Sequence, residues 1–470
     1  MRVVMKFGGT SLADGKAAKK ALEIIHEYLQ KGWSLVVVVS ALSQVTDRLI
    51  EASEAALRRD LATVRAICQE LKRRHEKFLE DIIEDPNRKV EISRFVQERM
   101  EELEKVLVGI GYLGELTPRS RDYVLSFGER LVAPIIAAAL CNLGFRAKAF
   151  TGSEAGIITD SNFGEARPLM EMTKLQVRQR LEPELEAGTV PVVTGFIATD
   201  QNGYITTLGR GGSDYTATIL GVSLKADEVW LWTDVDGLMT TDPKVEPLAR
   251  TIPQLSFQEA VEMAALGAKR MHPRALEPTS EAGIPVRIKN TFRRDFEGTL
   301  ITGEARVRPG SIVKALTLIK DVAMITVSGS GMVGTPGTAA RIFDALGRNG
   351  INILMISQSS SEANISFVIP RSLLGKAVTA LETSLLGGGL IKDVEAEADV
   401  CIIAAVGAGM KGTPGVAARI FKAVGDEGIN VRMIAQGSSE LNISFVVKES
   451  EGERAIRALH KEFRLHEGIP

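Results

Sequence analysis

A chain of 470 residues has room for about three domains at roughly 150 residues each, which excludes a single small module. Its 57 Lys and Arg against 59 Asp and Glu give a net charge of -2, so no basic field draws it to nucleic acid or anionic lipid. With 45% hydrophobic and 25% charged residues, the composition is that of a globular protein and excludes disordered, collagen-like and coiled-coil classes. The expected partners are small molecules.

Cysteine usage and the apolar stretches bear on the compartment. The three cysteines form no C-x-x-C pair and are odd in number, so neither a disulfide framework nor a thiolate zinc site is expected. The longest apolar stretches, residues 35–39 and 131–141, are shorter than the ~18 residues of a membrane span. Met1 leads directly into a strand-like segment with no signal-peptide pattern. We therefore expect a cytoplasmic protein.

The chain begins with a strand, a glycine turn and a helix. Residues 2–7 predict a buried strand that ends at Gly8-Gly9, and residues 14–30 predict a helix. Residues 33–41, with four consecutive valines, are continuously apolar in the way expected of a strand covered on both faces. This order favours a parallel α/β sheet.

A charged helical region follows this second strand. From Thr46 to Val108, apolar residues recur at helical spacing, and Pro86 predicts a break between two helices. Acidic and basic residues interleave there, which indicates a solvated packing surface and not a nucleic-acid arm. Histidines in charged helical surroundings are expected to be solvated as well; these are His26, His75, His460 and His466.

Strand patterns recur further along the first part of the chain. They occupy residues 145–149, 190–196, 229–233 and 286–290, with helical segments between them. Strands that alternate with helices are typical of a parallel α/β sheet. The first ~290 residues are therefore expected to form one α/β domain.

Beyond Phe292 a polar joint leads into a tandem repeat. Residues 329–337 match residues 407–415, and the same offset along the chain joins Asn352 to Asn430 and Gln358 to Gln436. Each copy predicts strand, helix, strand, turn and strand. Two copies of one small domain are expected to end the chain.

Each repeat contains a G-x-G-x-x-G pattern that could mark a dinucleotide-binding turn. That site needs a βαβ unit with an acidic residue at the end of the second strand, where Asn352 and Asn430 stand instead. We therefore reject the dinucleotide interpretation. Thr335-Pro336 and Thr413-Pro414 predict a helix N-cap with proline in the first turn, and the backbone N–H groups of such an end suit a carboxylate.

The first candidate site is the turn after the first strand. Lys6 precedes Gly8-Gly9, where the missing side chains let backbone N–H groups approach a phosphate closely. A P-loop pattern is absent, so this would be another kind of phosphate cradle. The alternative is an ordinary turn after a strand.

The second candidate site is the glycine-rich segment Thr207–Asp214. Arg210, Ser213 and Asp214 place a cation, a hydroxyl and an acid on one turn that opens a helix. Three glycines around an arginine are costly in flexibility for a mere connection. The alternative is a capped helix start with a solvent-facing arginine.

A third segment, Thr233–Pro243, follows a buried strand, at the end where open α/β sheets bind ligands. Its alternative is an acidic loop without a ligand. Lys269 and His272 follow a helix that starts at Ser256. A lysine in a last helical turn is commonly a partner of the helix dipole, and His272 is only a minor candidate for a catalytic base.

Together these segments resemble the aspartate kinases of the amino acid kinase family. The resemblance rests on residues 6–11, 43–47, 126–130, 207–217, 233–243 and 267–273 and extends over the tail, whose repeats resemble paired ACT domains. It implies a three-layer αβα sandwich with a mainly parallel sheet, followed by two ferredoxin-like βαββαβ ACT domains. The implied boundaries are a catalytic domain at 1–292, a linker at 293–312 and ACT domains at 313–398 and 399–470.

The resemblance also implies roles for individual residues. Lys6, Gly8 and Gly9 would cradle the ATP phosphates, and Asp214 would orient the reacting groups, with Arg210 and Lys269 also counted as catalytic. The residues implied to hold aspartate are Thr46, Glu129, Arg210 and Ser213. The rest of the nucleotide site would comprise Thr233, Asp234, Met239, Lys244, Lys269 and Arg270. Many family members carry tyrosine where Met239 stands. The effector would contact Gln358, Gln436, Asn352 and Asn430.

The implied reaction uses ATP and Mg²⁺ to phosphorylate the β-carboxylate of L-aspartate, the first step toward lysine, threonine and methionine. A side-chain carboxylate with a reference pKa near ~3.9 is already ionised at neutral pH, so phosphoryl transfer needs alignment and positive charge but no general base. Arg210 can form a fork on the α-carboxylate, and Glu129 can pair with the ammonium group. The protein would be monofunctional.

Feedback control is expected through the ACT pair, with threonine as the first choice of effector and lysine as the second. A homodimer or higher homo-oligomer formed through the ACT domains is also implied. Two alternatives stay open. One is another amino acid kinase, and the other is an amino acid sensor that has lost phosphoryl transfer.

Overall fold

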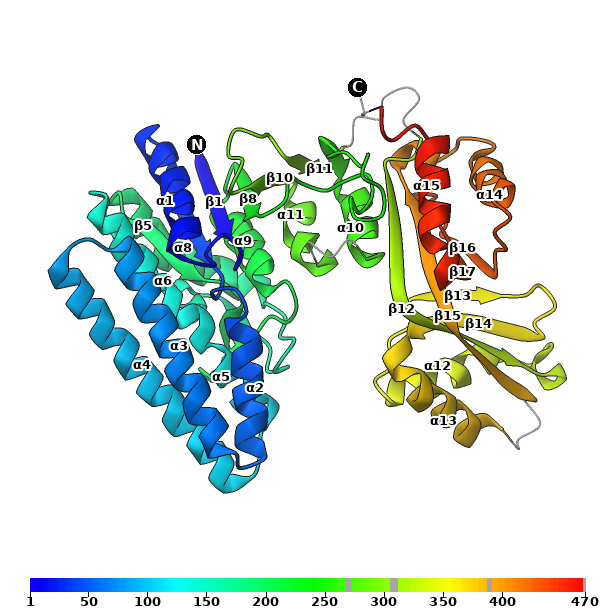
Figure 1. The fold of residues 1–470 in the computed structure, drawn as a ribbon, viewed down its shortest axis with the longest axis horizontal. Coiled ribbons are helices and arrows are strands. Elements are labelled where there is room, and N and C mark those ends of the chain that lie inside the picture. Colours follow the sequence, from blue (N-terminus) through cyan, green and yellow to red (C-terminus); the bar gives the residue numbers. More distant parts are fainter. Residues whose placement is uncertain (268–271, 305–311, 387–390, 468–470) are drawn as a thin grey trace. The chain divides into compact units, whose positions relative to one another are not determined.

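The computed structural model describes residues 1–267, 272–304, 312–386 and 391–467, which form two compact units (Figure 1). The first unit comprises Met1–Leu238, Pro253–Phe257 and residues 272–304. The second comprises Met239–Ile252, residues 258–267 and the described chain from residue 312 onward. Two short segments that precede residue 270 are thus grouped with the C-terminal repeats.

The first unit is built on a sheet with the strand order β3-β5-β2-β1-β8-β10-β11-β9. Neighbouring strands run parallel except β10 and β11. The strands are β1 (Arg2–Phe7), β2 (Ser34–Val39), β3 (Ala147–Phe150), β5 (Val190–Thr194), β8 (Glu228–Thr233), β9 (Gln254–Ser256), β10 (Val286–Asn290) and β11 (Thr299–Thr302). A smaller sheet joins β4 (Ile158–Thr159), β6 (Ile197–Asp200) and β7 (Ile205–Thr207). The mainly parallel sheet is confirmed.

Helices cover both faces of this sheet, as alternate residues of β1 show. Val3, Met5 and Phe7 belong to the core that packs on α1 (Gly15–Gln30) and α6 (Phe127–Asn142), with α2 (Val45–Leu57), α3 (Leu61–Ile82) and α4 (Pro86–Leu113) beyond them. Val4 points to the other face, where α9 (Gly212–Ser223) packs beside α8 (Met170–Glu186) and α11 (Glu277–Ala282). The predicted three-layer αβα architecture is confirmed.

The charged region forms three helices where the sequence predicted two. The break at Pro86 is present, since Asp85 accepts the N–H of Asn87 and so caps α4. A further break separates α2 from α3, where Arg59 has a φ of 61° and Asp60 caps α3 through the N–H of Thr63. The interruption escaped prediction because it contains neither glycine nor proline.

Residues 118–142 contain α5 (Pro118–Leu125) and α6, and this stretch is long and apolar enough to cross a membrane. It was not singled out from the sequence, where the apolar run around Pro134 is shorter. Of its most apolar window, 83% is buried inside the first unit. Burial at that level is typical of a core helix, and α6 packs against β3 and β5 of the sheet.

The second unit carries the two repeats on one antiparallel sheet in the order β13-β14-β12-β15-β17-β16. Its strands are β12 (Ala315–Ser328), β13 (Met355–Gln358), β14 (Asn364–Pro370), β15 (Asp393–Val406), β16 (Met433–Gln436) and β17 (Asn442–Lys448). Its helices are α12 (Thr338–Arg348), α13 (Leu374–Leu385), α14 (Val416–Asp426) and α15 (Gly452–Glu462). The expected pair of small α/β repeats is confirmed.

The long strand β12 contributes to both repeats. Leu316, in its first half, packs in the core of the second repeat with Phe445, whereas Ile325, in its second half, packs in the core of the first with Phe367. The division expected at residue 399 stays a prediction, and the structure adds that residues before 320 pack with the second repeat. The expected linker at 293–312 also differs, because β11 lies within it and pairs with the sheet.

Short elements complete the described chain. These are α7 (Gly152–Ala155), α10 (Phe257–Ala265) and the 3-10 helices η1 (Pro273–Leu276), η2 (Ser330–Met332), η3 (Arg371–Leu373), η4 (Ala408–Met410) and η5 (Glu449–Glu451).

Within the second unit, polar contacts fasten α10 to the second repeat. Glu259 on α10 is fully buried, pairs with Lys314 at 3.0 Å, and accepts the N–H of Ala408 at 2.7 Å. Glu262, one turn further, accepts a hydrogen bond from the side chain of Asn442. These contacts explain why a helix that precedes residue 270 is grouped with the C-terminal repeats.

Two histidines expected to be solvated are buried. His460 is buried in the second unit, where its Nε2 lies 3.1 Å from the hydroxyl of Thr240. His75 is fully buried in α3, its Nδ1 lies 2.7 Å from the carbonyl of Leu71, and burial lowers its pKa to about 4. The expectation was wrong because charged neighbours along a helix do not show which face a residue occupies.

Candidate active site

Lys6 and Asp214 form a partly buried ion pair at the centre of the first unit. Lys6 lies near the end of the central strand β1, and Asp214 lies in the first turn of α9. The Nζ and Oδ1 atoms are 2.6 Å apart, and each side chain is little more than a tenth exposed. A carboxylate at this distance fixes the position of the lysine ammonium group near the C-terminal end of β1.

The Gly8-Gly9 turn follows directly. A Cβ atom on Gly8 would lie 3.4 Å from Lys6 Nζ, so the ammonium group lies close above the glycine backbone. A Cβ atom on Gly9 would lie 3.0 Å from the carbonyl oxygen of Ala41, at the end of the neighbouring strand. The Gly8 N–H differs from expectation, because it donates to the carbonyl of Trp232 at 3.1 Å and is not directed at a ligand.

Glu129 lies in the first turn of α6 and is buried. Its Oε1 accepts the N–H of Ala41 at 3.1 Å, whereas its Oε2 is buried with no hydrogen-bond partner among the described residues. Burial raises the pKa of Glu129 to about 8, against the opposing effects of the Ala41 N–H and the charge of Lys6. A buried carboxyl oxygen without a donor can accept a hydrogen bond from a ligand N–H group.

The turn before α9 carries Arg210 and Ser213, and it lies close to Gly195 through Ser213 and to His272 through Gly211. Gly209 and Gly211 have φ values of 75° and 74°, a conformation that favours glycine. A Cβ atom on Gly211 would lie 2.6 Å from the Cβ of His272, so the turn tolerates no larger residue there. Arg210 is exposed. Burial lowers the pKa of His272, and the charges of Arg274 and Arg210 lower it further.

Two further predicted residues lie at the ends of elements in the first unit. Thr233 ends β8, and its hydroxyl donates to the exposed Asp234 carboxylate at 3.1 Å. Thr46 lies in the first turn of α2 and is half-buried. Because β1, β2 and β8 are adjacent and parallel, the segments that follow them leave the same edge of the sheet.

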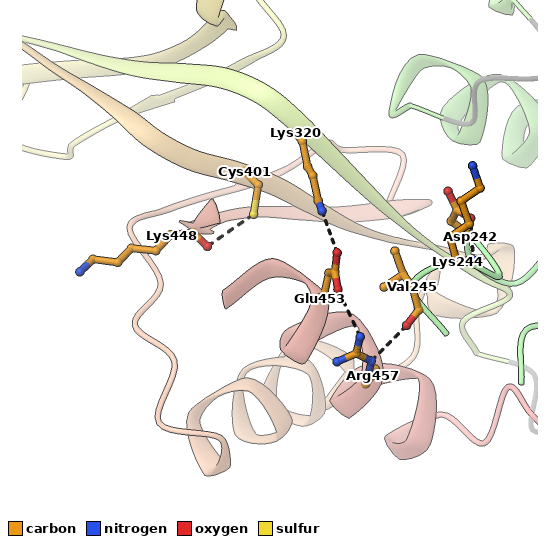
Figure 2. A network of polar contacts seen from close by, with 8 residues as sticks. All are labelled: Asp242, Lys244, Val245, Lys320, Cys401, Lys448, Glu453 and Arg457. Carbon is orange, nitrogen blue, oxygen red and sulfur yellow. Dashed lines mark hydrogen bonds and ion pairs between the residues drawn. The ribbon is translucent and has the colours of Figure 1, made fainter. Parts of the chain in front are cut away.

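Met239 and Lys244 belong to the second unit. Their segment is held by α15, where Arg457 Nε donates to the carbonyl oxygen of Val245 at 3.0 Å. Figure 2 shows this contact and its continuation through Glu453 to Lys320, with Nζ and Oε1 2.8 Å apart. Lys244 is exposed, and its N–H donates to Asp242 at 2.9 Å.

Lys269 and Arg270 lie outside the described residues, so their predicted roles stay predictions.

The repeats place their predicted effector residues at equivalent positions. Gln358 ends β13 and Gln436 ends β16, and both are exposed, as are Asn352 and Asn430. The predicted helix starts were wrong by two residues, because Gly337 and Gly415, with φ values of 84° and 83°, are the N-cap residues.

In each repeat a carboxylate of the chain itself binds a backbone N–H group of the glycine turn. Glu362 accepts the N–H of Gly334 at 2.9 Å, and Glu440 accepts that of Gly412 at 2.7 Å. These N–H groups precede the helix N-caps at Gly337 and Gly415, so the expectation that the helix ends suit a carboxylate stays a prediction.

Among the residues that the structure describes, no group of three or more His, Cys, Asp and Glu side chains could hold a metal ion. Asp214 is already paired with Lys6. Magnesium is commonly bound by one or two carboxylates together with substrate phosphates. The residues present therefore fit a Mg²⁺ ion that arrives on a nucleotide, with Asp214 and Asp234 as candidate carboxylates.

The structure thus brings Lys6, Asp214, the Gly8-Gly9 turn and Glu129 into one region of the first unit. Sequence analysis missed Asp122, a buried carboxylate that holds the start of the Arg210 turn. The sequence spacing could have indicated it. Asp122 and Glu129 are seven residues apart in one helical stretch, so the two carboxyl groups lie on the same helix face.

Comparisons with known proteins agree with this arrangement. Models of the amino acid kinase family and of the ACT domain match residues 1–290 and residues 325–385 and 403–463, respectively. Aspartokinase 1, chloroplastic, of Arabidopsis thaliana is 35% identical over 472 residues, which cover 98% of this chain and 80% of that protein.

Two solved structures of E. coli aspartokinase III cover 98% of this chain and 99% of their own at 28% identity. The complex with aspartate and ADP (R-state) has a TM-score of 0.83, and the complex with lysine and aspartate (T-state) has a TM-score of 0.78.

Proposed function

Since this chain belongs to the aspartokinases of the amino acid kinase family, we propose that it transfers the γ-phosphoryl group of ATP to the β-carboxylate of L-aspartate. The observation that carries the proposal is the Lys6–Asp214 pair beside the buried, half-satisfied Glu129. One region of the first unit thereby offers a fixed cation for a phosphate and a carboxyl group that can ionise to pair with an ammonium group. The aspartate and ADP bound by the E. coli relative support these two partners.

The two charges have separate tasks in the proposed reaction. Lys6, held by Asp214, stabilises the negative charge that develops on the transferred phosphoryl group. The β-carboxylate of aspartate is the nucleophile and is ionised at neutral pH, so the site has to align it and not to deprotonate it. No general base is assigned, which agrees with the minor role given to His272.

Recognition of the amino acid falls to the other end of the site. Glu129 pairs with the α-ammonium group, and Arg210 forms a fork on the α-carboxylate. Thr46 and Ser213 supply hydroxyl groups in the first turns of α2 and α9. This division predicts that changes at Arg210 alter the Michaelis constant for aspartate more than that for ATP.

The nucleotide is proposed to lie against Lys6, Gly9, Thr233 and Asp234 in the first unit. Met239, Lys244, Lys269 and Arg270 stay predicted contributors. Mg²⁺, when bound with ATP, would neutralise phosphate charge.

A coupled assay of ADP release tests the proposal. Release should depend on L-aspartate at saturating ATP, and glutamate and acetylglutamate should give none. Release with either of those acceptors alone would make the protein another amino acid kinase. Absence of release with all acceptors, together with amino acid binding, would favour the non-catalytic sensor.

We further propose feedback inhibition by an amino acid bound to the repeats. Gln358 and Gln436 led to threonine as the first choice, whereas the lysine complex of the E. coli relative supports lysine. Titration of the aspartate-dependent rate with each amino acid decides between them. A rate that responds to neither would refute feedback by both.

The assignment to the first step toward lysine, threonine and methionine, the homodimer formed through the ACT domains and the cytoplasmic location stay proposals. The chain spans about half the length of the bifunctional relatives that join an aspartokinase to a homoserine dehydrogenase.

A further inference from the structure

Asp122 is a buried carboxylate that the proposed reaction does not use. It lies on α5, one helix before Glu129, and its residue is 1% exposed. A charged group so deeply buried is retained in folded proteins only where hydrogen-bond donors compensate for the lost water. The donors around Asp122 therefore show what its carboxylate holds.

Three donors meet this carboxylate. Its Oδ2 accepts the backbone N–H of Thr207 at 2.8 Å and that of Gly164 at 2.9 Å. Its Oδ1 accepts the hydroxyl of Thr207 at 2.8 Å. Asp122 thus fastens two segments from different parts of the chain.

Both segments border the turn that carries Arg210. Thr207 ends β7 and begins the turn, and its carbonyl accepts the N–H of Ala166 at 2.9 Å. A Cβ atom on Gly209 would lie 3.3 Å from the carbonyl oxygen of Gly164. The segment of Gly164 therefore supports the turn from the side, and Asp122 fixes both partners.

Glycines make this support necessary. Gly209 and Gly211 flank Arg210 in left-handed conformations and leave the backbone free to move unless neighbouring segments restrain it. Charge-assisted hydrogen bonds to a buried carboxylate are among the stronger restraints that a fold can supply.

We propose that Asp122 is a positioning residue for the proposed function, which holds the Thr207–Ser213 turn so that Arg210 meets the α-carboxylate of aspartate. No substrate contact is assigned to it, because it is buried and its oxygens accept these three donors. Its removal therefore raises the Michaelis constant for aspartate while the constant for ATP changes little.

Two substitutions separate this role from a need for negative charge. In Asp122→Asn, the amide oxygen still accepts both N–H groups, and the amide nitrogen donates to Thr207 if its hydroxyl turns round. In Asp122→Ala, all three donors lose their acceptor. We expect the Michaelis constant for aspartate to rise about 10- to 100-fold in Asp122→Ala and by about threefold or less in Asp122→Asn.

Asp200 offers a matched control. It is equally buried and also accepts two backbone N–H groups and one hydroxyl, from Asn202, Tyr204 and Ser161. Asn202 and Tyr204 lie at the far end of the β6–β7 hairpin, and Ser161 follows β4; none of these donors of Asp200 is Thr207 or Gly164. Asp200→Ala should lower the thermal midpoint as Asp122→Ala does, yet leave both Michaelis constants unchanged.

Initial rates with varied aspartate and varied ATP, and calorimetric titration of the folded variants with L-aspartate, test the inference. If the wild type is active and Asp122→Ala has unchanged Michaelis constants, the inference is overturned. An equal rise of the Michaelis constants for aspartate and for ATP in Asp122→Ala would also overturn it. If Asp122→Ala does not fold, Thr207→Val removes one donor, and an unchanged constant for aspartate there would also overturn it. A wild type that neither binds nor phosphorylates aspartate would instead refute the proposed function.

Discussion

Glu129→Gln removes the most perturbed carboxyl group of the candidate site and changes almost nothing in shape. Burial raises the pKa of Glu129 from 4.5 to about 8, against the N–H of Ala41 and the charge of Lys6. Each pKa unit corresponds to about 1.4 kcal/mol, so the ionised form is disfavoured in the empty protein by about 5 kcal/mol at most. At neutral pH the empty protein avoids this cost because Glu129 keeps its proton, and binding of an ammonium group would favour the ionised form.

The sign of the effect on stability follows from proton binding. Between about pH 4.5 and 8, the native protein keeps a proton on Glu129 that the unfolded chain has released. The free energy of unfolding of the empty protein therefore falls as pH rises through this range. Glu129→Gln has no such group, so it should gain stability relative to wild type on going from about pH 5 to about pH 9, by at most about 5 kcal/mol.

Two measurements check this prediction. Urea unfolding of wild type and variant without ligands, near pH 5 and near pH 9, gives the relative stability, and an unchanged difference would refute the raised pKa. Initial rates give the functional side. Binding of the ammonium group needs the ionised carboxylate, which becomes more populated as pH rises toward 8. The Michaelis constant of wild type for aspartate should therefore fall by up to about tenfold for each unit of pH increase below pH 8. In Glu129→Gln the constant should be higher and lack this slope; a slope equal to wild type would contradict the assigned role.

Three further substitutions probe the two units. Lys6→Ala should lower kcat by about 100-fold or more with the fold retained, and near-wild-type turnover in a folded variant would contradict the proposed charge stabilisation. Arg210→Lys should raise the Michaelis constant for aspartate about tenfold, since an ammonium group cannot form the fork; an unchanged constant would count against that contact. Lys314→Met removes the ammonium group that lies 3.0 Å from the buried Glu259 carboxylate and should lower the free energy of unfolding by about 3–5 kcal/mol, as measured by urea unfolding of the full chain. A loss below about 1 kcal/mol would show that other partners of Glu259 suffice.

Local patterns predicted the elements that depend on neighbouring residues alone. The valine run of β2 is apolar on both faces because helices cover both sides, and the glycines at 209 and 211 mark backbone that only glycine readily adopts. The repeats were visible because both copies keep the same turn residues at the same offset. Such signals survive without the fold because they record local sterics and burial.

Tertiary structure alone decided which charges meet. The sequence singled out Lys6 and Asp214 separately, but their distance of 2.6 Å depends on α9 packing beneath β1, more than 200 residues along the chain. It likewise gave no sign that Glu129 would keep one oxygen without a donor or that Asp122 would anchor Thr207. Hydrogen bonds and desolvation act over a few ångströms, and contacts at that range between distant segments exist only once the chain has folded.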